Sequence, residues 1–240
     1  MTVIVTGGTS GIGLASAKKF LANGFNCVLV GRSRERFDKI KSELGGRVEF
    51  VSADVRRVSD CERVVARTVE HFGGVDVLIN CAGIYAEGAI TATDEKTFDD
   101  IFATNVKGTF FMTRAAVGEL IKSRGAIVNV ASDAGLKGNY FCAAYSASKG
   151  AVVAFTRSLA LELASFPVRV NCVAPGDVLT PLTLNQLKLS GETLEALAEV
   201  YPLGRIAAAE EVAAAIYFLA SKAASFITGA VLSVDGGLTA

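Results

Sequence analysis

Short apolar runs rich in β-branched residues alternate with segments of helical periodicity along nearly the whole chain. The runs are continuously apolar, which is typical of strands that are covered on both faces of a sheet. They are Val3–Thr6, Asn26–Val30, Val48–Val51, Val75–Ile79, Ala126–Val130, Arg169–Val173 and Val231–Val234. Helical crossovers between such runs favour parallel pairing. The pattern therefore predicts an α/β fold, with a single Rossmann-type doubly wound parallel sheet of about seven strands and helices on both faces.

No internal boundary between domains is visible. The chain has no tandem repeat, low-complexity segment or Pro/Ser-rich linker, and only four prolines occur. We therefore expect one domain over residues 1–240. One irregular stretch, at about 177–205, carries leucines around Gly191, and it is predicted to close over a substrate as a lid. The alternative is a helical pair packed into a contact between subunits.

The first strand enters a glycine-rich turn, Thr6-Gly7-Gly8-Thr9-Ser10-Gly11-Ile12-Gly13, and then a helical pattern that Asn23-Gly24 closes. Glycine lets the backbone approach a pyrophosphate closely, and the free amides and dipole at a helix start favour its negative charge. A glycine-rich turn alone is often only a tight turn. Its place between an N-terminal strand and a helix favours phosphate binding.

The second strand ends in Gly31-Arg32-Ser33, where dinucleotide-binding folds commonly place an acidic residue on the ribose hydroxyls. That acid is missing here. Gly31 leaves space, and the guanidinium of Arg32 suits a 2′-phosphate, so the residues favour NADP(H) over NAD(H). The alternative is a solvated arginine that begins the next helix.

Candidate chemistry lies between Ser132 and Lys149. If Ala143 to Ala164 is helical, Tyr145 and Lys149 lie one turn apart on the same face. A free phenol has a pKa of about 10, and a neighbouring positive charge favours phenolate, so we expect an acid or base that works nearer neutral pH. Ser132 ends an apolar strand, where it can share a hydrogen bond to a carbonyl oxygen. Tyr-x-x-x-Lys alone is a weak motif, and its weight comes from context.

The composition of the chain restricts the kinds of partner that the protein can bind. The chain is 51% hydrophobic and 20% charged, with a net charge of +0 and a pI near 6.6, so no field favours nucleic acid or a membrane surface. The amino terminus enters a strand directly, which predicts no signal peptide and a cytoplasmic protein. A single histidine and scattered cysteines predict reduced thiols and no metal site. The five cysteines are Cys27, Cys61, Cys81, Cys142 and Cys172.

Taken in order, these motifs resemble those of the classical short-chain dehydrogenase/reductase family over nearly the whole chain. The residues that carry the resemblance are the Thr-Gly-x-x-x-Gly-Ile-Gly turn, Asn80-Cys81-Ala82-Gly83, Asn105, Ser132, Tyr145, Lys149, Pro175-Gly176 and Asp235-Gly236-Gly237. Cys81 is a small departure, because the family more often has asparagine there. Pro202-Leu203-Gly204-Arg205 brings the chain closest in pattern to 3-oxoacyl-carrier-protein reductase-like members.

The resemblance implies a catalytic tetrad of Asn105, Ser132, Tyr145 and Lys149. Ser132 and Tyr145 would bind the substrate oxygen, and Tyr145 would give or take the proton. Lys149 would hold the nicotinamide ribose and favour the tyrosinate, while Asn105 would distort its helix and complete a proton relay. Hydride would pass between the substrate carbon and the nicotinamide.

The resemblance also implies cofactor contacts at the strand ends. Asp54 would accept a hydrogen bond from the adenine amine, and Val178 and Thr180 would contact the carboxamide. The full predicted set is Gly7, Thr9, Ser10, Gly11, Ile12, Gly13, Arg32, Ser33, Asp54, Val55, Asn80, Ala82, Gly83, Asn105, Tyr145, Lys149, Pro175, Gly176, Val178 and Thr180.

The predicted substrate pocket is mostly apolar, which suits a small ketone, an aldehyde or the corresponding alcohol. Its residues are Ala134, Asn139, Phe141, Val178, Leu182 and Leu187. A 3-oxoacyl-ACP/CoA reductase is the alternative, although the positions at which such reductases dock an acidic carrier hold Ser123 and Phe166. A catalytically silent NADP(H)-binding sensor or scaffold is the alternative of another class. The family implies a homotetramer, or a homodimer.

Overall fold

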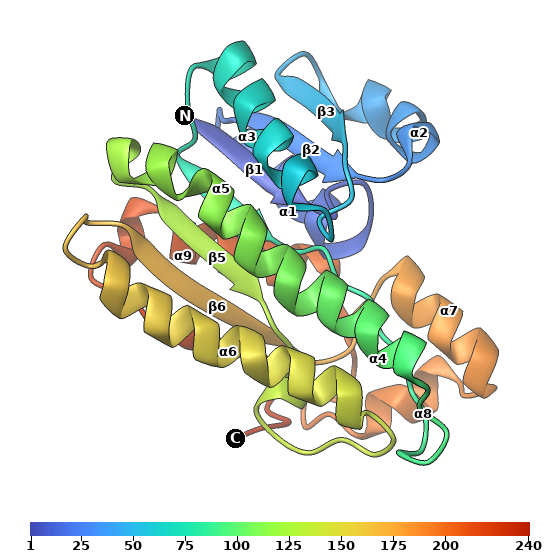
Figure 1. Cartoon of the computed structure of the whole chain (residues 1–240). Coiled ribbons are helices and arrows are strands. Elements are labelled where there is room, and N and C mark those ends of the chain that lie inside the picture. Colours follow the sequence, from blue (N-terminus) through green and yellow to red (C-terminus); the bar gives the residue numbers. More distant parts are fainter.

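A parallel sheet forms the centre of the computed structural model, which describes residues 1–240 (Figure 1). The sheet has 7 strands in the order β3-β2-β1-β4-β5-β6-β9, and every neighbouring pair is parallel. The strands are β1 Thr2–Thr6, β2 Asn26–Gly31, β3 Val48–Ser52, β4 Val77–Asn80, β5 Ala126–Val130, β6 Arg169–Pro175 and β9 Val231–Val234. The predicted doubly wound α/β fold is confirmed.

Two strands, Ala126–Val130 and Val231–Val234, match the prediction, the others differ from it by one or two residues at one or both ends, and one small sheet was not predicted. Strand β4 begins at Val77 instead of Val75, because pairing with β1 starts at Val3 opposite Val77 and the carbonyl of Val75 instead accepts a hydrogen bond from the Ser123 hydroxyl. A second, 2-stranded sheet of β7 (Val178–Leu179) and β8 (Ala207–Ala208) was not predicted. Strands this short leave no periodicity to recognise in a sequence.

Helices cover both faces of the central sheet, as Figure 1 shows. They are α1 Gly11–Ala22, α2 Arg34–Leu44, α3 Val58–Phe72, α4 Glu95–Phe102, α5 Gly108–Ser123, α6 Ala143–Leu163, α7 Pro181–Ser190, α8 Leu194–Glu199 and α9 Ala209–Ala220. Short helical segments of other pitch are η1 Ala103–Lys107, η2 Asp133–Gly135 and η3 Lys222–Ala224.

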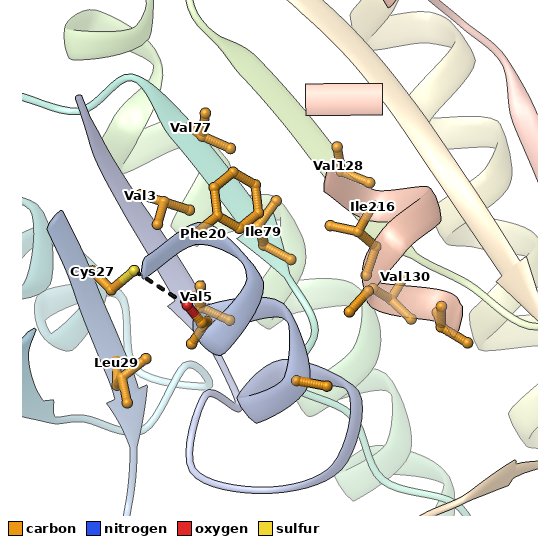
Figure 2. Close-up of a cluster of buried hydrophobic side chains, with 14 of the residues drawn as sticks. Val3, Val5, Phe20, Cys27, Leu29, Val77, Ile79, Val128, Val130 and Ile216 are labelled. Atoms are coloured by element: carbon orange, nitrogen blue, oxygen red, sulfur yellow. Dashed lines mark hydrogen bonds between the residues drawn. The ribbon is translucent and has the colours of Figure 1, made fainter. Parts of the chain in front are cut away.

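The core consists of one apolar layer on each face of the sheet. On one face, side chains from the strands pack with residues of α1, α2 and α9, including Phe20 and Ile216 (Figure 2). On the other face they pack with α3, α5 and α6. In β1, Val3 and Val5 belong to the first layer and Ile4 to the second, and all three are fully buried. This two-sided burial is the physical reason for the continuously apolar strands.

A buried polar ladder connects the middle of the sheet to two helices. The Asn80 amide donates to Thr113 Oγ1 on α5 and to Asn129 Oδ1 on β5, each at 2.9 Å. Asn129 in turn donates to Thr156 Oγ1 on α6 at 2.9 Å. Buried polar groups need such partners, and these shared hydrogen bonds fix the elements that they join, with only Asn80 Oδ1 left without a partner in the ladder. The ladder thereby sets α6, which carries Tyr145 and Lys149, relative to β4 and β5.

The strand order reverses between β1 and β4, because the chain first builds outward through β2 and β3 and then returns to the other side of β1. In open α/β sheets, ligands bind at the carboxyl ends of the strands beside such a reversal. The loops after β1, β4, β5 and β6 converge at this edge. They carry most of the residues singled out from the sequence.

Candidate active site

A cleft of about 480 Å³ opens at the carboxyl edge of the sheet. Its walls come from the loops after β4, β5 and β6, from α6, and from the segment containing α7 and α8. Ser132, Tyr145 and Lys149 all line it, whereas Asn105 lies behind the wall. The structure therefore brings three of the four predicted catalytic side chains to one cavity.

Ser132 follows β5 in extended conformation and begins the short turn η2. Its residue is 8% exposed. The hydroxyl donates to Asp133 Oδ1 at 2.7 Å and accepts from the amide of Ala134 at 3.2 Å. These contacts fix the side chain at the base of the cleft, next to the Tyr145 phenol.

Tyr145 and Lys149 lie one turn apart on α6, as the spacing predicts. The ammonium of Lys149 is 5.6 Å from the centroid of the Tyr145 ring and donates to the carbonyl of Val130 at 2.9 Å. Lys149 is 6% exposed, and burial lowers its pKa. The helix thus presents both groups to the same cavity.

The pKa of the Tyr145 phenol is raised by burial in this structure, and hydrogen bonding with Ser132 opposes this rise only in part. The charge of Asp133 adds to the rise, and the Lys149 ammonium donates to the backbone carbonyl of Val130. Tyr145 is consequently a protonated phenol at neutral pH, and the effect of Lys149 on a tyrosinate stays a prediction.

Asn105 lies in the π-helical segment η1 between α4 and α5, so the predicted distortion of this long helix is present. It is 1% exposed. Its Oδ1 accepts from the amide of Ile84 at 2.9 Å, and its Nδ2 donates to the carbonyl of Ile84 and to Ser148 Oγ, each at 3.0 Å. The side chain therefore joins the loop after β4 to α6.

Gly83 is the point at which Asn105 and Lys149 approach the same backbone. A Cβ atom at Gly83 would lie 3.3 Å from Asn105 Oδ1 and 3.5 Å from Lys149 Nζ. Ala82, one residue earlier, packs on Gly7 of the glycine turn, where a Cβ would meet backbone atoms of Ala82 at 3.1 Å. The predicted Asn-x-Ala-Gly turn therefore lies between the glycine turn and the lysine.

The glycine turn is built for close backbone approach. A Cβ at Gly13 would lie 2.3 Å from the carbonyl oxygen of Gly7, and Gly7 and Gly11 have φ of 66° and 51°. Ser10 is the N-cap of α1, and its side chain makes no capping hydrogen bond. The first amides of α1 are left for a ligand, so this turn fits the phosphates of a dinucleotide.

Thr6 holds the two neighbouring loops together, a role that sequence reasoning missed. Its hydroxyl accepts hydrogen bonds from the amides of Cys81 and Ala82, each at 3.0 Å. In the sequence, Thr6 stands out only as the residue before the glycines. Nothing in its local pattern indicates a contact with residues 75 positions away.

The residues predicted to meet the adenosine end lie beyond the glycine turn. Arg32 is exposed, directly after Gly31, where a Cβ would lie 3.3 Å from Thr9 Oγ1. Ser33 caps α2 by accepting from the amide of Arg36 at 3.2 Å. Asp54 pairs with Arg56 at 2.7 Å, and this hydrogen bonding lowers its pKa.

Two predicted cofactor contacts have side chains that point into packed regions. The Asn80 amide is used by the ladder within the sheet, and Asn80 does not line the cleft. Val55 is 9% exposed, and its methyl groups leave no room for a side chain at Gly108, where a Cβ would lie 2.7 Å away. Any contact by these two residues to a cofactor in the cleft would have to come from the backbone.

The Pro175-Gly176 turn ends β6 against the ring of Tyr201, which a Cβ at Gly176 would approach to 2.6 Å. Val178 belongs to β7, and Thr180 caps α7. Thr180 also reaches the glycine turn, since a Cβ at Gly11 would lie 3.1 Å from its methyl group. The segments predicted to hold the phosphates and the carboxamide of a dinucleotide therefore touch one another.

Five of the six residues predicted for the substrate pocket line the cleft. Ala134, Asn139, Val178, Leu182 and Leu187 line the cleft. Phe141 does not: its φ is 56°, its ring is directed outward with 60% exposure, and its backbone carbonyl accepts from the amide of Gly88. Tyr140 lines the cleft instead.

Tyr85 is a further wall residue that the sequence did not reveal. Its ring packs edge-to-face on the Tyr145 ring, with centroids 4.8 Å apart. Its hydroxyl donates to Glu87 at 2.9 Å and lies 3.0 Å from Cys142 Sγ at the start of α6. Asp133, Asp177 and Tyr201 were missed in the same way. The motifs assign roles to the residues beside them, and nothing in the local sequence indicates a role for their own side chains.

No helix of the structure combines the length and the apolar composition that crossing a membrane requires. No group of three or more His, Cys, Asp or Glu side chains is placed to hold a metal ion.

Comparison with known proteins gives full-length matches. A family profile described as "Enoyl-(Acyl carrier protein) reductase" matches residues 7–239. Galactitol 2-dehydrogenase (L-tagatose-forming) of Cereibacter sphaeroides is 41% identical, over 98% of this chain and 93% of the relative. The 3-oxoacyl-(acyl-carrier-protein) reductase FabG of Thermotoga maritima is 39% identical, over 98% of this chain and 96% of the relative.

Solved structures of similar proteins superpose closely. "ElxO with NADP Bound" is 33% identical, with a TM-score of 0.93, and the match covers 99% of this chain and 98% of that one. A 3-ketoacyl-(acyl-carrier-protein) reductase from Brucella melitensis complexed with NADH is also 33% identical, with a TM-score of 0.92 and coverage of 100% and 98%.

Three phenols at this edge, of which Tyr201 is buried and Tyr85 and Tyr145 are half-buried, predict how stability depends on pH. Burial raises the pKa of Tyr85, Tyr145 and Tyr201 in the folded chain. A raised folded-state pKa stabilises the fold below the unfolded value of about 10, and the contribution is lost as pH rises through the folded value. The free energy of unfolding, measured in urea by circular dichroism, should therefore fall as pH rises above about 10.

Tyr145→Phe should make that fall less steep, because one titrating phenol is gone. Tyr140→Phe is the matched control, since Tyr140 is 91% exposed and its removal should leave the slope unchanged. Equal slopes for Tyr145→Phe and the unaltered protein would contradict the assignment.

Proposed function

The chain belongs to the classical short-chain dehydrogenase/reductase family, and we propose on that basis that its cleft reduces the carbonyl group of a small substrate with NADPH. It is an oxidoreductase that uses a nicotinamide cofactor and acts on CH–OH groups and their ketones. One observation carries the proposal: Ser132, Tyr145 and Lys149 line a single cleft that borders the glycine turn at Ile12.

The turn from Gly7 to Gly13 is the proposed cradle for the cofactor phosphates. The observations that support it are the Gly13 backbone approach, which any Cβ would block, and the α1 amides that lack a side-chain cap. Bound there, the cofactor supplies the hydride in its reduced form. The chain contributes binding, orientation and the proton.

Ser132 and Tyr145 are proposed to hold the substrate carbonyl oxygen with their hydroxyl groups. As hydride arrives at the carbonyl carbon, the phenol of Tyr145 gives its proton to the oxygen, and an alcohol results. This direction needs a protonated phenol, and Tyr145, whose pKa burial raises further, is protonated at neutral pH. Carbonyl reduction is therefore the proposed working direction.

Lys149 and Asn105 are proposed to support Ser132 and Tyr145. The buried ammonium of Lys149 lies beside Tyr145 and near Gly83, where it can meet ribose hydroxyls and a tyrosinate once the proton has left. Asn105 makes hydrogen bonds to the amide and the carbonyl of Ile84 and so fixes the loop after β4. We place it in the route by which a proton returns to Tyr145.

NADP(H) is proposed over NAD(H) on the strength of Arg32. The two solved relatives carry NADP in one case and NADH in the other, so they do not decide. Arg32 is exposed beside the glycine turn, no acid follows β2 at this point, and its guanidinium is free of ion pairs in the chain. A 2′-phosphate is the ligand that this fork suits.

Two substrate classes compete for the cleft. The galactitol dehydrogenase relative favours a small hydroxylated substrate, and the carrier-protein reductase relatives favour an acyl thioester. Ser123 and Phe166 are exposed and uncharged, which offers nothing to an acidic carrier. A small carbonyl compound is therefore the first choice. Binding of NADPH without turnover of any ketone would instead favour a sensor or scaffold.

Residues 177–205 are proposed as a substrate lid within one domain of 1–240. Leu182 and Leu187 of α7 and Leu197 of α8 line the cleft, and both helices rest on the anchors at Thr180 and Tyr201. Amide hydrogen exchange of α7 with and without NADPH would measure closure.

A cytoplasmic homotetramer is the proposed state of the protein. Exposed apolar side chains lie on the outer faces of the long helices and near the last strand, namely Phe110, Leu161, Phe166, Phe226 and Leu232. Such a distribution favours contacts between copies. The mass from light scattering would distinguish a tetramer from a dimer or a monomer.

Tyr145→Phe tests the proposed proton donor. The change removes the hydroxyl and keeps the ring, so kcat for a ketone should fall by at least about 1000-fold while NADPH affinity stays within about twofold. Turnover is followed by NADPH absorbance and binding by fluorescence titration. Tyr140→Phe, also in the cleft wall, should keep its rate. A near-normal rate for Tyr145→Phe would overturn the assignment.

Arg32→Asp tests the proposed cofactor preference. The new carboxylate would repel a 2′-phosphate and accept bonds from ribose hydroxyls, so the ratio of kcat/KM for NADPH over NADH should fall by about 100-fold or more. Arg36→Asp, an exposed change on α2, controls for net charge. An unchanged ratio in Arg32→Asp would argue against NADP(H) as the preferred cofactor.

A further inference from the structure

The charged lining of the cleft is mostly acidic. Its carboxylates are Glu87, Asp133, Asp177 and Glu192, and its bases are Lys137 and Lys149. The ammonium of Lys149 donates to the carbonyl of Val130. Lys137 is the only other cation among the lining residues. A cleft of this composition attracts hydrogen-bond donors and repels anions.

Asp177 is the most firmly held of these carboxylates. It follows Gly176 at the end of β6, and the hydroxyl of Tyr201 donates to its Oδ2 at 2.7 Å. The same hydroxyl accepts from the backbone amide of Asp177 at 2.6 Å. The ring of Tyr201 lies against Gly176. Tyr201 thus fixes both the backbone and the side chain, and Oδ1 of Asp177 has no hydrogen-bond partner in the chain.

Asp133 stands on the other side of the reacting groups. It is 6% exposed and follows Ser132, whose hydroxyl donates to its Oδ1 at 2.7 Å. Its Oδ2 makes no hydrogen bond within the chain, although the residue lines the cleft. Asp133 and Asp177 line the same cleft as Ser132 and Tyr145, and the charges of both contribute to the raised pKa of Tyr145. Both carboxylates therefore border the cavity in which a substrate carbonyl would bind.

We propose that Asp177, together with Asp133, determines substrate choice by reading the group next to the carbonyl. A hydroxyl or protonated amine at that place can donate to a fixed carboxylate oxygen, whereas a carboxylate or phosphate there meets like charge in a desolvated cleft. The substrate class is then an uncharged or cationic carbonyl compound with an adjacent hydrogen-bond donor. This inference rests on the proposed carbonyl reduction.

Matched pairs of substrates test it with the intact protein and NADPH. Acetoin and butanone differ by one hydroxyl beside the carbonyl, and methyl acetoacetate and acetoacetate differ by one negative charge. We expect kcat/KM to favour acetoin over butanone, and the ester over acetoacetate, each by about tenfold or more, since a hydrogen bond to a charged group has that magnitude.

Asp177→Asn is the principal variant, because it keeps the shape and removes the charge. Both substrate ratios should move toward one by about tenfold, while KM for NADPH stays unchanged. Comparing each ratio between the variant and the unaltered protein cancels the intrinsic reactivity of the ketones. Glu195→Gln removes a charge from α8 outside the cleft and should leave both ratios as they are.

Tyr201→Phe separates the charge from its support. It keeps the carboxylate but frees it, so the acetoin preference should weaken while the discrimination against acetoacetate persists. If Asp177→Asn lowered kcat/KM equally for all four substrates, or left both ratios unchanged, the inference would be overturned while the proposed function would stand. If the unaltered protein turned over none of the four substrates, the proposed function would fail and this inference with it.

Discussion

The fold depends on backbone segments that touch at the carboxyl edge of a parallel sheet. A Cβ at Gly13 would lie 2.3 Å from the carbonyl oxygen of Gly7, which excludes a side chain, while Cβ atoms at Gly7 and Gly11 would lie 3.1 Å from Ala82 and Thr180. The last two contacts join the glycine turn after β1 to the loop after β4 and to the start of α7. Parallel strands bring these loops to one edge of the sheet. The dense apolar core on both faces holds the strands in place, and with them the loops that form the site.

Much of this was visible in the sequence. The seven strands followed from continuous apolar runs, since burial on both faces leaves no polar positions to interrupt them. Ser132, Tyr145 and Lys149 could be placed together because a strand end and a helical spacing of four fix directions locally. The glycine turn could be placed for the same reason, as its strand and helix are adjacent in the chain.

What the sequence could not supply depends on contacts between distant residues. Tyr201 supports Asp177 across 24 positions, and Tyr85 meets Tyr145 across a loop and a helix start. Phe141 was misplaced because a positive φ directs its ring outward. The rise in the pKa of Tyr145 could not be predicted, because no local pattern of the sequence reports burial.

The way in which residues 181–200 are attached has a consequence for how such an enzyme changes over evolutionary time. This segment is tied to the sheet at its two ends, through the Thr183 hydroxyl on the carbonyl of Val178 and through Tyr201 on Asp177. The glycine turn and the Asn105 contacts lie outside it. Substitutions within it leave those contacts in place, so this segment can vary independently of the residues proposed to hold the cofactor and to move the proton.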